Sequence, residues 1–215
     1  MDQNVILVET VPLEFDLESL GCRLRIRPGQ TKFMDRLSRL AEEAARVARP
    51  KAVARLCGLT ILDEEKVQVG EVTFSSPLLR QKMDGLGRTF PYLASEGTEL
   101  ADWSLSLSSS LEQVFASALR EVAVQQAENL LERTLLERYG IAQVSAMNPG
   151  SLKVWSLEEQ VPLFELLAPL PEKLGVTLLP SLMMRPEYSV SGVFFQTDSK
   201  FYNCQLCPKK ECPNR

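Results

Sequence analysis

Apolar residues recur at helical spacing in two long stretches of the chain. In residues 31–48 they fall on one face of a predicted helix, with charged residues on its other faces, and Pro50 ends it. Over Ser110–Tyr139 the same spacing continues almost unbroken until Gly140. The first residue of this second helix and Gln113 fit a capping box. We therefore expect a helix of roughly 45 Å, long enough to cross a whole domain.

The other apolar positions form shorter, β-like runs. Residues 52–62 and 67–74 flank an acidic loop and predict an antiparallel hairpin. The remaining expected elements are strands at 5–15, 90–94 (weakened by Pro91) and 190–196, and helices at 77–83 and from Ser156, which forms a second capping box with Glu159. Helices and strands mix without βαβ regularity, which predicts an α+β fold with a mainly antiparallel twisted sheet flanked by helices. We expect one such domain over residues 1–198 and a Cys-rich tail at 199–215.

The composition narrows the possible chemistry. The 215 residues include no histidine, which excludes a Ser-His-Asp triad, a Cys-His pair and any histidine-ligated metal. A formal net charge of −4 argues against a general binder of nucleic acid or of membrane surfaces. Neither a basic, signal-like N-terminus nor an apolar run of ~20 residues is present, so we expect a cytoplasmic location and no membrane partner.

Two stretches could carry a ligand. In the first, Asn148, Pro149, Gly150 and Ser151 form a tight turn before a predicted helix start, where backbone N–H groups can receive a carboxylate or phosphate. The second comprises Met184, Arg185, Ser189, Ser191 and Gly192, where an arginine is followed by a strand of small residues that a ligand or another backbone can approach. The alternative interpretations are a loop that only redirects the chain and a buried strand with methionines filling the core.

Taken together, these stretches resemble a known family. Asn-Pro-Gly-Ser, Trp155, Gly175-Val-Thr-Leu-Leu, Met-Met-Arg-Pro and Ser-Val-Ser-Gly follow one another in the order and spacing found in the activation domain of cobalamin-dependent methionine synthase. The segment Ala127-Glu-Asn-Leu-Leu-Glu-Arg133 is also similar to a stretch of that domain. The resemblance extends from about Ala127 to Phe195, and Ser-Val-Ser-Gly with its Met and Pro is the most specific part.

The resemblance implies a fold and a function. The family's domain binds S-adenosylmethionine and docks on a cobalamin domain, where a reduced corrinoid is remethylated, so its catalysis is positional. It also implies that this chain serves a separate corrinoid protein, with an electron donor such as a flavodoxin or ferredoxin. The chain departs from the family at its Arg-x-x-x-Gly-Tyr-Pro signature. Ser145 stands at the tyrosine position and no arginine precedes it at the required spacing.

The tail contains Cys204, Cys207 and Cys212. A CxxC turn brings two thiolates together, and a third cysteine suits an iron–sulfur cluster with one open iron, or zinc completed by Cys22, Cys57 or a partner. A redox-active thiol pair and an inert tail are the alternatives. Cys22 and Cys57 lie in apolar contexts and are expected in the core.

Two functions follow from these observations. The first is a stand-alone relative of the activation domain that assists reductive reactivation of a corrinoid protein with S-adenosylmethionine. In this hypothesis the turn of Asn148, Pro149 and Gly150 faces the ligand, and the stretch that contains Met184, Arg185, Ser189, Ser191 and Gly192 forms the opposing wall. The second is a non-enzymatic metal- or iron–sulfur-binding interaction module that kept the fold and lost the adenosylmethionine site.

Overall fold

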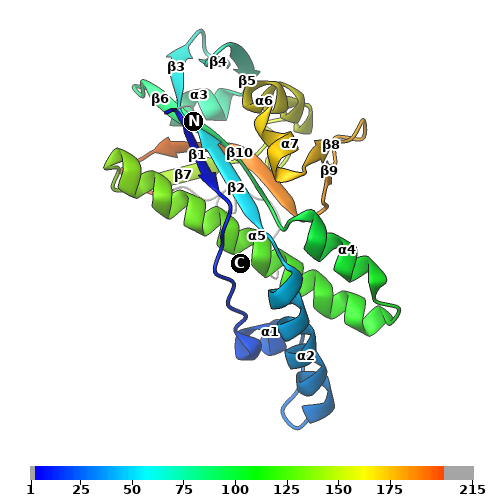
Figure 1. Cartoon of the computed structure of the whole chain (residues 1–215). Coiled ribbons are helices and arrows are strands. Elements are labelled where there is room, and N and C mark those ends of the chain that lie inside the picture. The colour runs from blue at the N-terminus through cyan, green and yellow to red at the C-terminus, as the bar shows by residue number, and fades with distance from the viewer. Residues whose placement is uncertain (1–2, 201–215) are drawn as a thin grey trace.

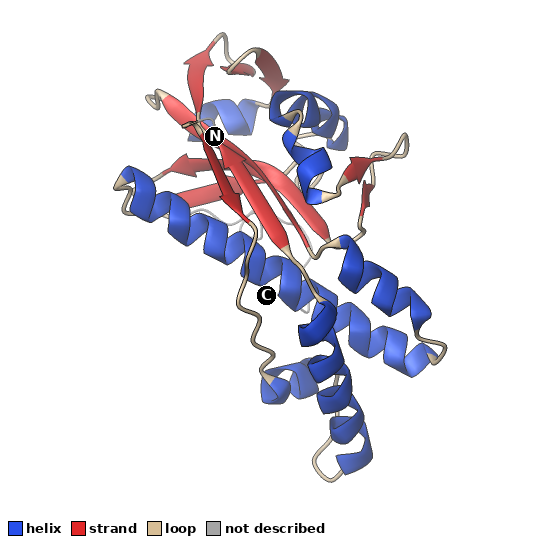
Figure 2. Cartoon of the chain, in the orientation of Figure 1, coloured by secondary structure: helices blue, strands red, loops and turns tan. Residues whose placement is uncertain are grey.

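A single antiparallel sheet organises the protein (Figures 1 and 2). The computed structural model describes residues 3–200. The strands of this sheet are β1 (Val5–Val8), β2 (Lys51–Arg55), β3 (Cys57–Ile61), β4 (Lys66–Val69), β5 (Val72–Ser75), β6 (Arg88–Ser95), β7 (Val144–Met147) and β10 (Ser189–Gln196). Strand β6 is central, with β2 and β3 along one side and β10 along the other, and β1 and β7 lie outside β2 and β10. A separate hairpin pairs β8 (Thr177–Leu178) with β9 (Met184–Arg185).

Helices cover both faces of the sheet. The helices are α1 (Leu17–Arg23), α2 (Thr31–Val47), α3 (Pro77–Lys82), α4 (Thr98–Ser106), α5 (Ser110–Tyr139), α6 (Gln160–Leu167) and α7 (Leu170–Leu174), with a 3-10 turn at Leu157–Glu159. The C-terminal half of α5 packs on one face, while α3, α6 and α7 cover the other (Figure 1). The N-terminal half of α5 continues beyond the sheet and packs against α1, α2 and α4. The predicted α+β fold with a mainly antiparallel sheet and one long helix is confirmed.

Helix α5 has the predicted bounds, but its start differs from the prediction. Ser109, not Ser110, is the N-cap residue, and its side chain makes no capping bond. The side chain of Gln113 instead donates to the carbonyl of Leu107 at 2.9 Å. At the other end Gly140 adopts a left-handed conformation at φ 61° and its N–H bonds the carbonyl of Leu136, as expected of a C-terminal glycine.

The central strand β6 contains a proline, which lacks the N–H that a ladder needs. Pro91 is tolerated because the neighbouring strand is interrupted beside it. The predicted strand 52–62 is divided at Leu56 into β2 and β3, whose pairing with β6 stops at Tyr92 and resumes at Thr89. The N–H of Leu56 instead bonds the carbonyl of Asn4 at 2.7 Å.

The predicted hairpin is confirmed, with one correction. β3 and β4 pair around the acidic loop, with Leu59 opposite Val69. The predicted strand 67–74 is two strands, because the chain reverses at Gly70, which has φ 59°, and β5 then pairs with β4. The prediction missed this turn because no proline or Asn-Gly pair marks it.

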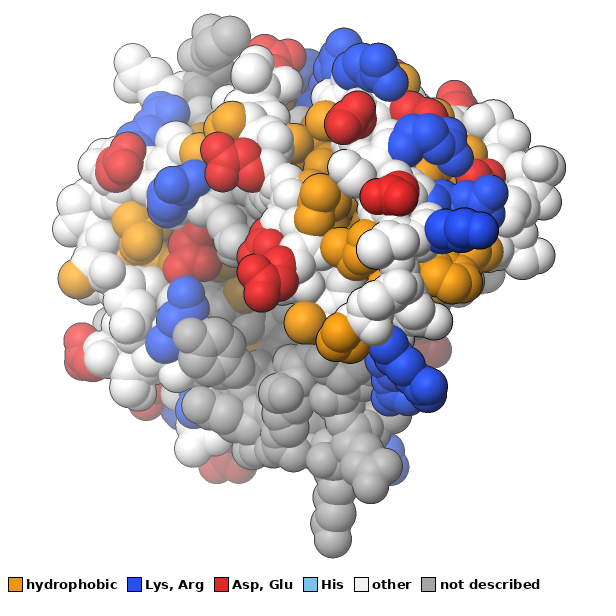
Figure 3. Space-filling model, turned by 90° about the horizontal axis from the view of Figure 1, so that it is seen from below, with side chains coloured by type: hydrophobic (Ala, Val, Ile, Leu, Met, Phe, Trp, Pro, Cys, Tyr) orange, Lys and Arg blue, Asp and Glu red, His pale blue; other side chains and the backbone are white. Residues whose placement is uncertain are grey.

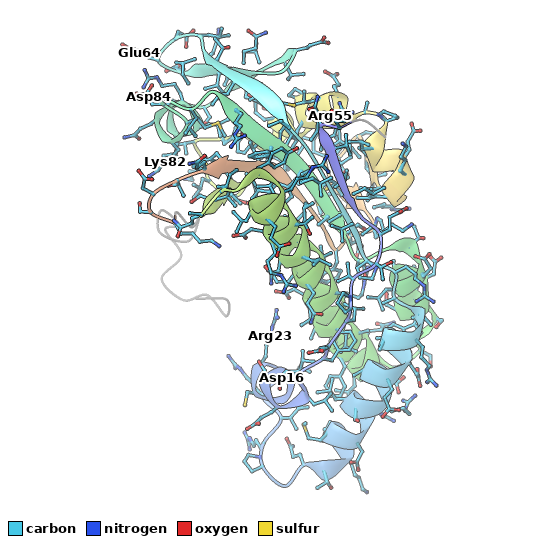
Figure 4. All side chains as sticks on the ribbon, turned by 60° about the vertical axis from the view of Figure 1, so that its left-hand side comes forward. Asp16, Arg23, Arg55, Glu64, Lys82 and Asp84 are labelled. Carbon is cyan, nitrogen blue, oxygen red and sulfur yellow. The ribbon has the colours of Figure 1, made fainter. Side chains whose placement is uncertain are left out.

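An arginine hydrogen-bonds the end of strand β2 to helix α6. Arg55, at the end of β2, donates through Nη1 to the carbonyl of Leu166 and through Nη2 to the carbonyl of Ala168 at 3.0 Å. These carbonyls belong to the C-terminal end of α6, where the last carbonyls of a helix lack intrahelical partners. Figure 4 shows Arg55 beside the helices that cover this face of the sheet.

Candidate functional site

The predicted turn at Asn148 lies directly beside the predicted small-residue strand. Strand β7 ends at Met147, which pairs with Val193 of β10, so Asn148 is carried against the middle of β10. The Asn148 side-chain amide donates to the carbonyl of Ser191 at 2.9 Å and to the hydroxyl of Tyr92 at 2.7 Å. The structure therefore brings together Asn148, Ser191 and Gly192, which the sequence pattern places on opposite walls of one site.

A buried hydrogen-bonded series continues from this turn to helix α5. The Tyr92 hydroxyl donates to Glu128 at 2.6 Å, and Glu132, one turn further along α5, bonds Lys200 at 2.7 Å. Burial raises the pKa of Tyr92 well above its usual value, and the charge of Glu128 adds to this rise. Burial also raises the pKa of Glu128, although the bond from Tyr92 opposes that rise. The Tyr92 hydroxyl therefore stays protonated and donates its hydrogen bond to the Glu128 carboxylate.

The small residues of β10 allow other groups of the protein to come close to this strand. A Cβ at Gly192 would lie 2.4 Å from the Met147 carbonyl oxygen and 2.6 Å from the Asn148 amide nitrogen. The hydroxyl of Ser189 donates to the carbonyl of Pro186 at 2.8 Å, and the hydroxyl of Ser191 lies 3.5 Å from Gln160. The sequence predicts that a ligand or another backbone can approach this strand, and at Gly192 the approaching group is the backbone of Met147.

The other half of the predicted turn borders an open hollow. Gly150 and Ser151 are exposed and, with the loop up to Leu157, line a mainly apolar hollow of about 840 Å³. Trp155, within this loop, is fully buried and packs edge-to-face on Phe74 with ring centroids 5.9 Å apart. Within residues 3–200 the Trp155 indole nitrogen has no hydrogen-bond partner. A hollow of this size and apolar lining can accept a flat organic ligand.

Met184 and Arg185 form β9 and lie elsewhere. Arg185 is exposed and lines a second cavity, of about 360 Å³, with Arg120 of α5 and Asp102 of α4. None of the residues around this cavity also lines the hollow at Ser151. The predicted site residues therefore divide between two places instead of facing one ligand.

A buried ion pair next to this second cavity has no signal in the sequence. Glu96 is fully buried and accepts two hydrogen bonds from Arg120, at 2.6 Å and 2.7 Å. The N–H of Tyr188 also donates to Glu96 at 3.2 Å, and the Arg120 guanidinium lies 4.5 Å from the centre of the Tyr188 ring. Burial raises the pKa of Glu96, and Arg120 opposes that rise. An acidic residue after a buried strand and an arginine midway along a helix are too common to pair from sequence alone.

The predicted metal site at Cys204, Cys207 and Cys212 lies outside the described residues and stays a prediction. Among residues 3–200, no group of three or more His, Cys, Asp or Glu side chains is arranged to hold a metal ion. The expectation that both remaining cysteines lie in the core is correct for Cys57 and wrong for Cys22, which is exposed on α1.

The surface of the protein carries mixed charge. Figure 3 shows basic and acidic side chains interspersed with small apolar groups on one face. Among the described helices, none has the length and apolar character required to cross a membrane.

The fold is an antiparallel sheet crossed by one long helix, with the Asn148 turn packed against strand β10. It is similar to the fold of a solved structure, the MetH reactivation domain bound to AdoHcy. The two structures align with a TM-score of 0.60 and 18% sequence identity, over 92% of this chain and 80% of that chain. At this identity the match establishes the fold. Neither a protein-family model nor a curated protein matches the sequence.

Proposed function

We propose that this protein is a relative of the MetH reactivation domain that assists reductive reactivation of a corrinoid protein. The fold match over 92% of the chain, to a domain solved with AdoHcy, is the observation that carries the proposal. The methyl donor would be S-adenosylmethionine, and the cobalamin would be held by the partner. The protein's part is to hold the methyl donor in line with the corrinoid, which requires no histidine.

The hollow at Gly150 and Ser151 is the place we assign to the methyl donor. It lies next to the turn that the resemblance singles out, and its apolar lining suits the adenine ring. The N–H groups of Gly150 and Ser151 already bond the carbonyls of Trp155 and Asn148, so the polar group at its edge is the hydroxyl of the exposed Ser151. Asn148 has a supporting role, because its amide is already bonded to Ser191 and Tyr92.

Calorimetric titration of the full chain with AdoHcy and S-adenosylmethionine tests the ligand. Ser151→Glu places a carboxylate in the hollow and is expected to weaken binding at least tenfold. Ser108→Glu is the matched control, because it makes the same change at an exposed loop position. An absence of heat with both ligands, or equal binding by both variants, would contradict this assignment.

Reactivation is tested separately. A corrinoid protein carrying cob(II)alamin is mixed with the chain, S-adenosylmethionine and reduced flavodoxin or ferredoxin, and its visible spectrum is followed. We expect conversion to methylcobalamin only when the chain is present. Conversion at the same rate without the chain would refute the proposed role.

The second candidate function is an interaction module without an adenosylmethionine site. Two observations favour it: the missing Arg-x-x-x-Gly-Tyr-Pro signature, and the close packing of Gly192 against Met147 and Asn148, which fills the space between these segments. In that case the chain would bind the corrinoid protein in a pull-down, and calorimetry would show no heat with AdoHcy or S-adenosylmethionine. Metal or iron–sulfur binding by the tail is compatible with both candidates.

A further inference from the structure

The cavity at Arg185 has features of a binding site in its own right. It lies between α4 on one side and the segment from the end of α7 to the start of β10 on the other, and its volume of about 360 Å³ is at the small end of ligand pockets. Its lining comes from segments far apart in the sequence, so the tertiary fold creates it.

Two arginines supply the positive half of this cavity. Arg120 is held rigidly because its Nε and Nη2 are bonded to the buried Glu96. Its Nη1 forms an ion pair with Glu187 at 3.8 Å, which is longer than a hydrogen bond, so this nitrogen can still donate to a ligand. Arg185 is exposed, and within residues 3–200 its side chain makes no hydrogen bond or ion pair. Two guanidinium groups beside one cavity fit a carboxylate.

Two carboxylates and an apolar wall complete the lining. Asp102 and Glu187 are both exposed and border the same cavity. These carboxylates would repel a ligand that is only anionic, and the two arginines would repel one that is only cationic. Leu105, exposed over 79% of its surface, and Ala101 add apolar surface beside these charges.

We propose that this cavity binds a free α-amino acid with an apolar side chain. The ligand carboxylate would lie at Arg120 and Arg185, its ammonium group at Asp102 and Glu187, and its side chain along Ala101 and Leu105. This site is separate from the hollow assigned to the methyl donor and does not depend on the proposed function.

Calorimetry with L-methionine as the probe tests the assignment. We expect binding in the millimolar range or tighter. Methionine methyl ester, which lacks the carboxylate, and 4-(methylthio)butanoate, which lacks the ammonium group, should each bind at least tenfold more weakly. L-glutamate should also bind more weakly, because its second carboxylate would approach Asp102 or Glu187.

Variants assign the two halves of the site. Arg185→Ala should abolish methionine binding, while Arg46→Ala, an exposed arginine on α2, should leave it unchanged. Asp102→Asn should weaken methionine binding at least tenfold and should not weaken binding of 4-(methylthio)butanoate, with Asp35→Asn as its control. All four positions are exposed, so the variants are expected to fold, and thermal melting checks this.

Three results would overturn the proposal: no binding of L-methionine, equal binding of the methyl ester, or full affinity in Arg185→Ala. AdoHcy, which carries an amino-acid end, separates this proposal from the proposed function. If Arg185→Ala removes AdoHcy binding and Ser151→Glu does not, the cavity is correct and the hollow is wrong. If AdoHcy fails to bind and L-methionine binds, only the proposed function fails.

Discussion

Replacing Gly192 by alanine should destabilise the protein through steric overlap alone. The added Cβ would lie 2.4 Å from the Met147 carbonyl oxygen, 2.6 Å from the Asn148 amide nitrogen and 2.9 Å from a ring carbon of Tyr92. Gly192 does not have the positive φ that would strain an alanine backbone. The sheet must therefore move β7 away from β10 by close to an ångström, because ordinary contact begins near 3.4 Å.

Two effects contribute to the expected loss in the free energy of unfolding. Overpacking a well-packed core costs about 1–3 kcal/mol, and weakening the bonds of Asn148 to Ser191 and Tyr92 adds about 1 kcal/mol. We expect Gly192→Ala to lower the free energy of unfolding by about 2–4 kcal/mol in urea titration. For a chain of this length the midpoint of thermal unfolding should fall by roughly 5–15 °C.

Gly58→Ala is the control. Gly58 also lies in the sheet, on β3, but a Cβ added there would meet no atom of another segment within 4 Å, and its φ is not positive. Its replacement should change stability by no more than about 0.5 kcal/mol. A second control combines Gly192→Ala with Asn148→Ala, which removes one overlapping group and should cost less than the sum of the two single changes. Equal destabilisation by Gly192→Ala and Gly58→Ala would refute the steric argument.

Three further outcomes are expected. Burial raises the pKa of Glu128 above 4.5, so the ionisation of this residue lowers the free energy of unfolding as the pH rises from about 4.5 through the pKa of the folded state. Glu128→Gln, measured by urea titration from pH 4 to 8, should therefore gain stability relative to the wild type over that pH range. A difference in stability that does not change with pH would contradict this. Arg55→Met should lower stability by about 1.5–3 kcal/mol by removing the bonds to the end of α6, whereas Arg46→Met should not. Cys207→Ser should reduce the metal or iron content of anaerobically purified protein, and unchanged content would exclude a tail metal site that uses Cys207.

The apolar periodicity of the sequence predicts those elements whose own residues supply a continuous apolar face. Helix α5 has the predicted bounds because its apolar spacing is continuous and Gly140 ends it. Helices α1 and α4 were not predicted, since their apolar faces are short and are completed only by packing against α2 and α5. The division of the predicted strand at Leu56 depends on the neighbouring Pro91, a tertiary effect that no local pattern contains.

The sequence pattern does not predict the geometry of the candidate site residues. A turn and a strand of small residues single out Asn148, Ser191 and Gly192, and the structure places these three residues in contact. Their partners Tyr92 and Glu128 belong to a central strand and a long helix, where one tyrosine or glutamate has no distinctive local sequence. Arg185 was expected opposite the Asn148 turn, but the β8–β9 hairpin carries it to another cavity.

The buried carboxylates near the predicted residues favour a positional role over acid–base catalysis. Glu128 accepts a hydrogen bond from the Tyr92 hydroxyl, and Glu96 accepts two from Arg120 and one from the Tyr188 backbone N–H. A general base must be able to reach a substrate proton, and these groups are already committed to donors of their own chain. Together with the absence of histidine, this supports the positional role that we propose above. The Tyr92–Glu128 and Glu96–Arg120 bonds connect β6 and the residue after it to helix α5, and Arg120 itself lines the cavity at Arg185.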